Sequence, residues 1–144
     1  MKLIFAFGLL FYGSSAFACT DFTGDYRTEV YTYYSLAQNG CESIDIIDES
    51  GSHQLVFDGV ERLHDEYDIV VDGQVLSHVQ IYLKSEMKEN SFVYHERDVI
   101  TSAKGEIDVL KKWAEVSFNE DTDLLTELHN DDGTVETYVD VRNR

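Results

Sequence analysis

Apolar and polar residues alternate in short runs along most of the chain. The runs are rich in β-branched and aromatic residues, and they span residues 44–47, 55–57, 67–71, 75–83 and 92–100. A period of two places every second side chain on the same face of an extended strand. The pattern therefore predicts an all-β protein whose strands each have one buried and one exposed face.

Turn-forming dipeptides separate these runs. Most are Asn-Gly or Asp-Gly pairs, which favour tight hairpins because glycine adopts a positive φ without steric cost. They are Asn39-Gly40, Asp58-Gly59, Asp72-Gly73, Lys104-Gly105 and Asp132-Gly133. Successive hairpins predict an antiparallel up-and-down meander that closes into a barrel of about eight to ten strands, since closure removes free edges. An open sandwich is the alternative.

The side-chain pattern also predicts how the last hairpin pairs, because a slip of one residue exchanges the two faces of a strand. A two-residue loop at Asp132-Gly133 places Leu128 and Val139 on one apolar face. The opposite face then carries Glu127 and Glu136. We therefore expect Leu128 and Val139 to point into the barrel.

The hairpin at Asp72-Gly73 follows a different rule. A two-residue loop would place Val79 on the same face as Glu66. A three-residue loop, residues 71–73 with Gly73 in a bulge, pairs Val70 with Gln74 instead. The resulting apolar face includes the candidate inward residues Tyr67, Ile69, Val79 and Ile81.

Residues 106–118 are compatible with two structures. Ile107, Leu110 and Phe118 recur near a helical period, whereas a strand would need a bulge around Lys111-Lys112. We expect a strand, because the neighbouring hairpins need a pairing partner.

The N-terminal stretch has the pattern of an export signal. Lys2 precedes an apolar run over residues 3–12, and Ala16-Phe17-Ala18 is a small-x-small cleavage site. The run is about half the length of roughly 20 residues that a membrane span needs. We expect residues 1–18 to be a signal peptide and residues 19–144 to form a single domain, periplasmic or extracellular.

The chain has two cysteines, Cys19 and Cys41, and whether they pair depends on the compartment to which the protein is exported. In an oxidising compartment, such a pair predicts a disulfide that fixes the start of the domain. The alternative is acylation of Cys19, which would make the protein an envelope lipoprotein. The two exclude each other, because an acylated Cys19 leaves Cys41 unpaired.

The charge of the chain limits its partners. Asp and Glu number 28 against 11 Lys and Arg, which gives a formal net charge of −17. This charge repels phosphate backbones, so no nucleic-acid partner is expected. No membrane span is expected either, and the oligomeric state is left open.

No motif for chemistry stands out. The five histidines lack metal-ligand spacing, although His64 and His78 are expected to face each other across the 63–83 hairpin. Nucleophile and phosphate-loop motifs are absent. Residues 119–123 and 130–133 fit polar turns better than calcium loops. We expect no catalytic residue, metal or cofactor.

Residues 22–27, Phe-Thr-Gly-Asp-Tyr-Arg, resemble the opening of the calycin barrels, which include lipocalins, fatty-acid-binding proteins and avidins. In that superfamily a Gly-x-aromatic motif starts the first strand, here Gly24 and Tyr26. A basic residue near the last strand often covers the aromatic ring in lipocalins, and the resemblance assigns this place to Arg142. Tyr26 replaces the usual tryptophan, and a second lipocalin motif is missing.

The resemblance implies a binding protein. A small apolar or amphipathic ligand would occupy the barrel, against the candidate lining residues Tyr67, Ile69, Val79, Ile81, Leu128 and Val139. One alternative is an envelope interaction protein with a filled barrel and an exposed aromatic patch at Tyr31, Tyr33 and Tyr34. Another is a periplasmic enzyme with converging polar groups in a cleft.

Overall fold

The computed structural model describes residues 18–143, so all but Ala18 of the expected signal peptide lies outside the described residues. This part of the chain contains ten strands and is all-β, as the alternation predicts. The strands are β1 (Gly24–Arg27), β2 (Tyr33–Asn39), β3 (Ser43–Asp48), β4 (Gly51–Val56), β5 (Arg62–Val71), β6 (Gln74–Met87), β7 (Ser91–Ser102), β8 (Ile107–Phe118), β9 (Leu124–Asn130) and β10 (Val135–Arg142).

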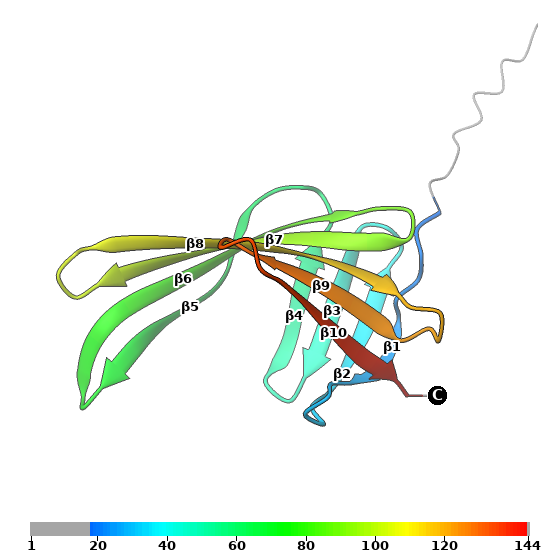
Figure 1. Cartoon of the computed structure of the whole chain (residues 1–144), viewed down its shortest axis with the longest axis horizontal. Helices are drawn as coiled ribbons and strands as arrows, with labels where there is room; N and C mark the ends of the chain where they lie inside the picture. The colour runs from blue at the N-terminus through cyan, green and yellow to red at the C-terminus, as the bar shows by residue number, and fades with distance from the viewer. Residues whose placement is uncertain (1–17, 144) are drawn as a thin grey trace, which may run out of the picture.

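The strands form one antiparallel meander in the order β4-β3-β2-β1-β10-β9-β8-β7-β6-β5. Each neighbouring pair is a hairpin of consecutive strands except β1 and β10, which join the two ends of the chain. The sheet curls strongly, so that β2, β3 and β4 face β7 and β8 (Figure 1). The meander and its barrel-like curl confirm the predicted fold class.

The seam of the curled sheet lies between β4 and β6. Within residues 18–143 the two end strands, β4 and β5, form no ladder with each other. Asp58 and Glu86 instead form a single antiparallel bridge. Beside it, the Gly59 N–H donates to the Ser85 carbonyl at 3.0 Å, and the Ser85 hydroxyl donates to the Val56 carbonyl at 2.9 Å.

The outer parts of β5 to β8 extend beyond the barrel as a twisted sheet (Figure 1). We call residues 66–80 and 98–111 the wing. Because β9 pairs with β8 only from Lys112 onward, residues 107–111 have β7 as their one ladder partner among the described strands. Large apolar side chains are exposed here: Tyr67, Ile69, Val70, Val71, Val75, Leu76, Ile107, Val109 and Leu110.

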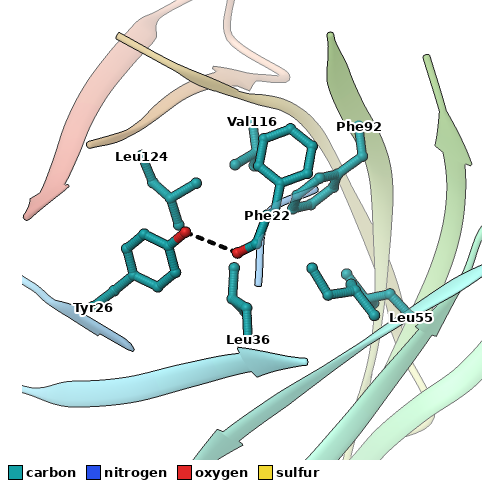
Figure 2. Packing of buried hydrophobic residues seen from close by; sticks show 8 residues of the cluster. Phe22, Tyr26, Leu36, Leu55, Phe92, Val116 and Leu124 are labelled. Atoms are coloured by element: carbon teal, nitrogen blue, oxygen red, sulfur yellow. Dashed lines mark hydrogen bonds between the residues drawn. The ribbon is translucent and has the colours of Figure 1, made fainter. Parts of the chain in front are cut away.

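The hydrophobic core fills one end of the barrel. Its fully buried side chains are Phe22, Tyr26 and Ile44. The Phe22 ring centre lies 4.9 Å from that of Phe118 and 5.2 Å from that of Phe92. The Tyr26 hydroxyl donates to the Phe22 carbonyl at 2.8 Å, so the one polar group of this ring is satisfied inside the core (Figure 2).

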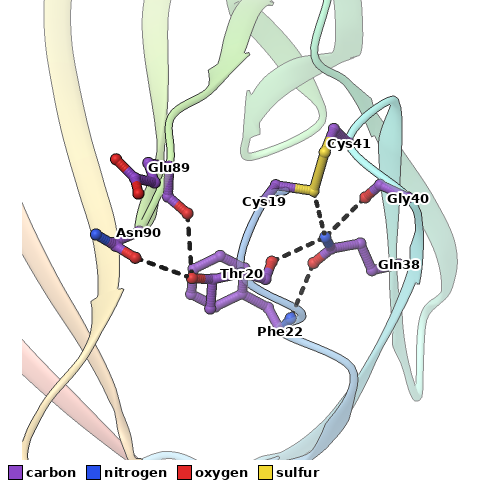
Figure 3. Close-up of a disulfide and its surroundings, with 8 residues drawn as sticks. All are labelled: Cys19, Thr20, Phe22, Gln38, Gly40, Cys41, Glu89 and Asn90. Atoms are coloured by element: carbon purple, nitrogen blue, oxygen red, sulfur yellow. Dashed lines mark hydrogen bonds between the residues drawn. A yellow bond between two sulfur atoms is a disulfide. The ribbon is translucent and has the colours of Figure 1, made fainter. Parts of the chain in front are cut away.

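The disulfide predicted between Cys19 and Cys41 is present, with the two Cα atoms 5.7 Å apart. It attaches residues 19–22 to the turn between β2 and β3. On the other side, the Thr20 N–H donates to the Glu89 carbonyl at 3.0 Å, in the turn between β6 and β7. The Thr20 hydroxyl donates to the same carbonyl at 3.1 Å (Figure 3). The segment therefore crosses the closed end of the barrel and is held at both sides.

Gln38 of β2 fixes the same segment through its side-chain amide. The Nε2 atom donates to the carbonyls of Thr20 and Gly40, at 3.0 and 2.7 Å. The Oε1 atom accepts the N–H of Phe22 at 2.9 Å (Figure 3). One side chain thus positions the backbone on which Phe22 enters the core.

Both predicted hairpin loops are wrong. At Asp72-Gly73 the loop has two residues, and Val71 pairs with Gln74. Asp72 and Gly73 both have positive φ, 51° and 75°, as a type I′ turn requires. The extra residue lies further along, where the register shifts between Ile69 and Val70.

The hairpin at Asp132-Gly133 shows the opposite change. Asn130 and Thr134 are joined by a backbone hydrogen bond of 2.9 Å, which leaves a three-residue loop ending at Gly133 with φ 84°. The Asp132 carboxylate accepts the Thr134 N–H at 2.9 Å and stabilises this turn. The register consequently pairs Val139 with Leu125, on the opposite face from the prediction.

Residues 106–118 form the predicted strand, β8, but without the expected bulge. The ladder with β7 runs without a break from Ile107 to Ser117. Unbroken alternation turns Trp113 to the outer face of the barrel, where its ring stacks on His129 with centres 3.7 Å apart. Trp113 therefore belongs to the outer surface of the barrel wall.

Candidate functional site

A cavity of about 540 Å³ lies inside the barrel next to the core. Its apolar lining comes from strands on all sides of the barrel: Leu36, Ile46, Leu55, Ile81, Leu83, Phe92, Val116 and Leu124. Several of these side chains also belong to the core, so the inner end of the cavity is the outer surface of the packed cluster.

Strand register explains why these side chains converge. Paired residues of an antiparallel ladder project from the same face. Leu36 pairs with Ile46, and Ile46 pairs with His53. Across the barrel, Val116 pairs with Thr126. These rows belong to the inner face of the curled sheet, and the core occupies only part of it.

The polar lining surrounds the rest of the cavity. It consists of Thr32, Tyr34, Asp48, His53, His64, Asp65, Tyr94, Glu96, Thr126 and Asp140. The four carboxylates come from four different strands, β3, β5, β7 and β10. Among residues 18–143, no Lys or Arg lines the cavity.

Tyr34 and Asp140 form one wall. The Tyr34 hydroxyl donates to Asp140 Oδ2 at 2.5 Å, and the Tyr34 ring stacks on Tyr26 with centres 5.7 Å apart. Burial and the bonded carboxylate together raise the pKa of Tyr34 far above its ordinary value. Tyr34 is therefore a neutral donor at physiological pH, and it is not part of an exposed patch with Tyr31 and Tyr33.

Two histidines form the wall near the seam. The rings of His53 and His64 lie with centres 5.4 Å apart. Burial, followed by the neighbouring His53, lowers the pKa of His64, so His64 is neutral at neutral pH. The prediction that His64 faces His78 is wrong. His78 lies on the wing, with its Nδ1 atom 2.8 Å from Asp68 Oδ1.

The third polar part of the lining is at Glu96. Its Oε1 atom lies 2.8 Å from Lys112 Nζ. Burial raises the pKa of Glu96, although the Lys112 ammonium opposes this effect. One oxygen of Asp98, Oδ1, is buried and has no hydrogen-bond partner within the described structure. Lys112 thus compensates Glu96, whereas the described lining contains no Lys or Arg for the other three carboxylates.

Only Ile81 of the six predicted lining residues lines this cavity. Tyr67 and Ile69 are about half exposed on the wing, and Val79 is buried there. Leu128 shares the inner face with Thr126 but lies beyond the cavity lining, and Val139 is on the outer face. Five of the six predicted lining residues therefore lie outside this cavity.

The three residues of the predicted barrel-end motif lie together. Tyr26 pairs with Arg142 across the β1–β10 ladder. The Arg142 guanidinium carbon lies 5.9 Å from the centre of the Tyr26 ring and 5.5 Å from that of Phe118. Arg142 Nη2 also donates to the Thr23 carbonyl at 2.5 Å, beside Gly24. The expected contact is present, while the calycin relationship itself stays a prediction.

Sequence reasoning missed most of the cavity because the alternation pattern identifies faces and not the strands that meet across a barrel. The sequence does contain one sign of the cavity, namely polar residues at positions that belong to otherwise apolar strand faces. Asp48 follows Ile44 and Ile46 at the same spacing, and His53 precedes Leu55. Such interruptions are typical of a face that leaves the core and enters a cavity.

Among residues 18–143, no group of three or more His, Cys, Asp or Glu side chains is arranged to hold a metal ion. In the same part of the chain, no helix is long and apolar enough to cross a membrane. No protein-family model, curated protein sequence or solved structure matches this chain.

Proposed function

We propose that the protein binds a small amphipathic molecule in the barrel cavity. The observation that supports this proposal is the combination of an apolar inner lining with a polar outer one. A volume of about 540 Å³ falls within the usual range of ligand pockets, about 300–1,000 Å³. The apolar part of a ligand would contact Leu36, Leu55 and Phe92, and its polar end would lie among the polar side chains.

The proposed setting is outside the cytoplasm. The disulfide between Cys19 and Cys41 supports it, because such bonds persist in oxidising compartments. The signal-like pattern of residues 1–18 supports it independently. A bridged Cys19 has no free thiol to acylate, so the proposal favours a released periplasmic or extracellular protein over a lipoprotein.

Titration with a neutral apolar fluorophore, N-phenyl-naphthylamine, tests the proposed binding. Thr126→Trp fills the cavity from β9, whereas Thr137→Trp is the matched control. Thr137 pairs with Glu127, on the outer face of the same hairpin. We expect saturable binding by the wild type and the control, and at least about tenfold weaker binding by Thr126→Trp.

Two results would contradict the proposal. One is the absence of saturable binding by the folded wild type. The other is equal affinity of the wild type and of a folded Thr126→Trp variant. Circular dichroism and the free energy of unfolding establish that each variant is folded.

A surface role is the second candidate function, and the wing favours it. Within residues 18–143, the outer edge of residues 107–111 has no ladder partner, and Ile107 and Leu110 are exposed there. Two copies of this edge, paired antiparallel about Val109, would place Ile107 of each chain opposite Lys111 of the other. Such a contact uses the same patch twice and closes after two chains. We therefore propose a second copy of this chain as its partner.

Light scattering over a range of concentrations tests this second proposal. Val109→Lys puts a charge on the edge and should yield a monomer, because lysine blocks edge pairing. Val30→Lys, at an exposed position in the β1–β2 turn, is the control and should dimerise like the wild type. A wild type that is monomeric at every concentration excludes the proposed dimer.

A further inference from the structure

We infer that the polar end of the ligand is a cation, such as a primary or quaternary ammonium group. This inference rests on the proposed binding function and names the chemical class of its ligand. It follows from the charges of the cavity lining, which in the described part of the chain includes four carboxylates and no Lys or Arg. The carboxylates lie on four strands, so they surround the cavity from several sides and do not form one acidic loop.

Three of these carboxylates have neutral partners. Asp140 accepts the Tyr34 hydroxyl at 2.5 Å, and Asp48 accepts the Ser50 N–H at 2.7 Å. Asp65 accepts the N–H of Glu66 at 2.8 Å. Hydrogen bonds of this kind orient a carboxylate but leave its charge uncompensated. A cation in the polar part of the cavity would be attracted by Asp65 and Asp140, which both line it.

The aromatic part of the polar lining favours the same ligand class. Tyr34 and Tyr94 both line the cavity, and burial raises the pKa of each. Neutral tyrosine rings attract ammonium groups through their electron-rich faces. His64, also in the lining, is neutral because burial lowers its pKa, so it adds no positive charge against such a ligand.

An anionic ligand would meet the opposite situation. A fatty-acid carboxylate placed in the polar lining would approach Asp48, Asp65 and Asp140 with no Lys or Arg among the described lining residues to pair with. Lys112, outside the lining, is already paired with Glu96 at 2.8 Å. Burying an unpaired like charge is costly, so the same alkyl chain should bind more weakly with a carboxylate than with an ammonium end.

Calorimetric titration with three probes of equal alkyl chain length tests the inference. The probes are an alkyltrimethylammonium, a neutral alkyl glucoside and an alkanoate, each below its micellar concentration. We expect the ammonium probe to bind at least about tenfold more tightly than the alkanoate. In the double variant Asp65→Asn with Asp140→Asn, this preference should fall to about threefold or less.

The double variant Glu29→Gln with Glu120→Gln is the matched control for net charge, because both residues are exposed in turns and lie outside the cavity lining. It should keep the full preference for the ammonium probe. Equal affinity for the three probes, or tighter binding of the alkanoate, overturns the inference but leaves the binding function intact. Failure of all three probes to bind overturns both.

Discussion

Arg142 lies across the ring of Tyr26, its partner in the β1–β10 ladder, with its guanidinium carbon 5.9 Å from the ring centre. The pair joins the last strand to the first at the closed end of the barrel. Arg142 also contacts Phe118 and the Thr23 carbonyl, so it holds together three segments that surround the core. Arg142 can lie this close to the backbone at residue 24 because Gly24 has no Cβ atom.

Replacing Gly24 with alanine should destabilise the protein. An added Cβ atom would lie 2.9 Å from Arg142 Nε and 3.3 Å from the Tyr26 hydroxyl oxygen, closer than ordinary contacts. We expect a loss of about 1–3 kcal/mol in the free energy of unfolding, measured by denaturant titration.

A double-mutant cycle identifies the cause of that loss. In an Arg142→Ala background the side chain that the new Cβ would meet is removed, so Gly24→Ala should cost markedly less. Equal costs in the two backgrounds would show that crowding by Arg142 is not responsible.

Removing the disulfide should loosen the closed end of the barrel. The bond joins Cys19 to Cys41, 22 residues apart. Replacing both with serine should lower the free energy of unfolding by about 3 kcal/mol, because the unfolded chain regains the freedom of that loop. Reduction of the wild type should lower its stability by a similar amount. Wild-type stability in both the variant and the reduced protein would contradict this prediction.

Gln38→Ala should destabilise the protein by about 1–3 kcal/mol, measured by urea unfolding. The change removes the acceptor for the Phe22 N–H and the donors to the Thr20 and Gly40 carbonyls. Gln38→Glu keeps the acceptor but places a carboxylate oxygen against the two carbonyls. It should therefore also be destabilising at neutral pH, and a neutral effect of both variants would refute the anchoring role.

The raised pKa of Tyr34 predicts that the folded protein loses stability at alkaline pH. The folded-state pKa of Tyr34 is raised above the ordinary value of 10.0, first by burial and then by Asp140. The folded state holds the Tyr34 proton more tightly than the unfolded state does. The resulting contribution of Tyr34 to the free energy of unfolding is complete below pH 10.0 and is lost as the pH rises above it. The wild type should therefore lose more stability above pH 10.0 than Tyr34→Phe.

Urea unfolding of both proteins across this pH range measures the effect. The other tyrosines are common to both and cancel in the difference. Parallel stability curves for the wild type and Tyr34→Phe would contradict the assigned role of Tyr34.

The fold class could be predicted from the sequence because its signals are local. β-branched alternation and glycine turns indicated antiparallel strands, and the need for a partner favoured a strand over residues 106–118. The disulfide was predictable because the chain has only two cysteines, both early.

The hairpin registers were not predictable because glycine with positive φ suits both loop types. Gly73 takes the second position of a type I′ turn, where Asp72 also adopts positive φ. Gly133 instead ends a three-residue loop that the Asp132 carboxylate stabilises. In the last hairpin both faces carry apolar residues, Leu125 and Val139 outside and Leu124 and Leu128 inside, so alternation does not select a register.

The cavity depends on contacts between distant strands. Tyr34 and Asp140 are 106 residues apart, and His53 and His64 meet only because the sheet curls to its seam. The wing contributed a further error, because its apolar alternation resembles that of a buried strand although Tyr67 and Ile69 are exposed. Periodicity therefore identified apolar faces without distinguishing the cavity from the wing.

Methyl-resolved NMR during titration with an alkyltrimethylammonium probe tests the central claim most directly, because it separates these two apolar surfaces. Binding in the cavity predicts saturable shifts of the methyl groups of Leu36, Leu55 and Leu124, with those of Leu76, Ile107 and Leu110 on the wing unchanged. Shifts confined to the wing methyl groups, with the cavity methyl groups unmoved at saturation, would contradict it.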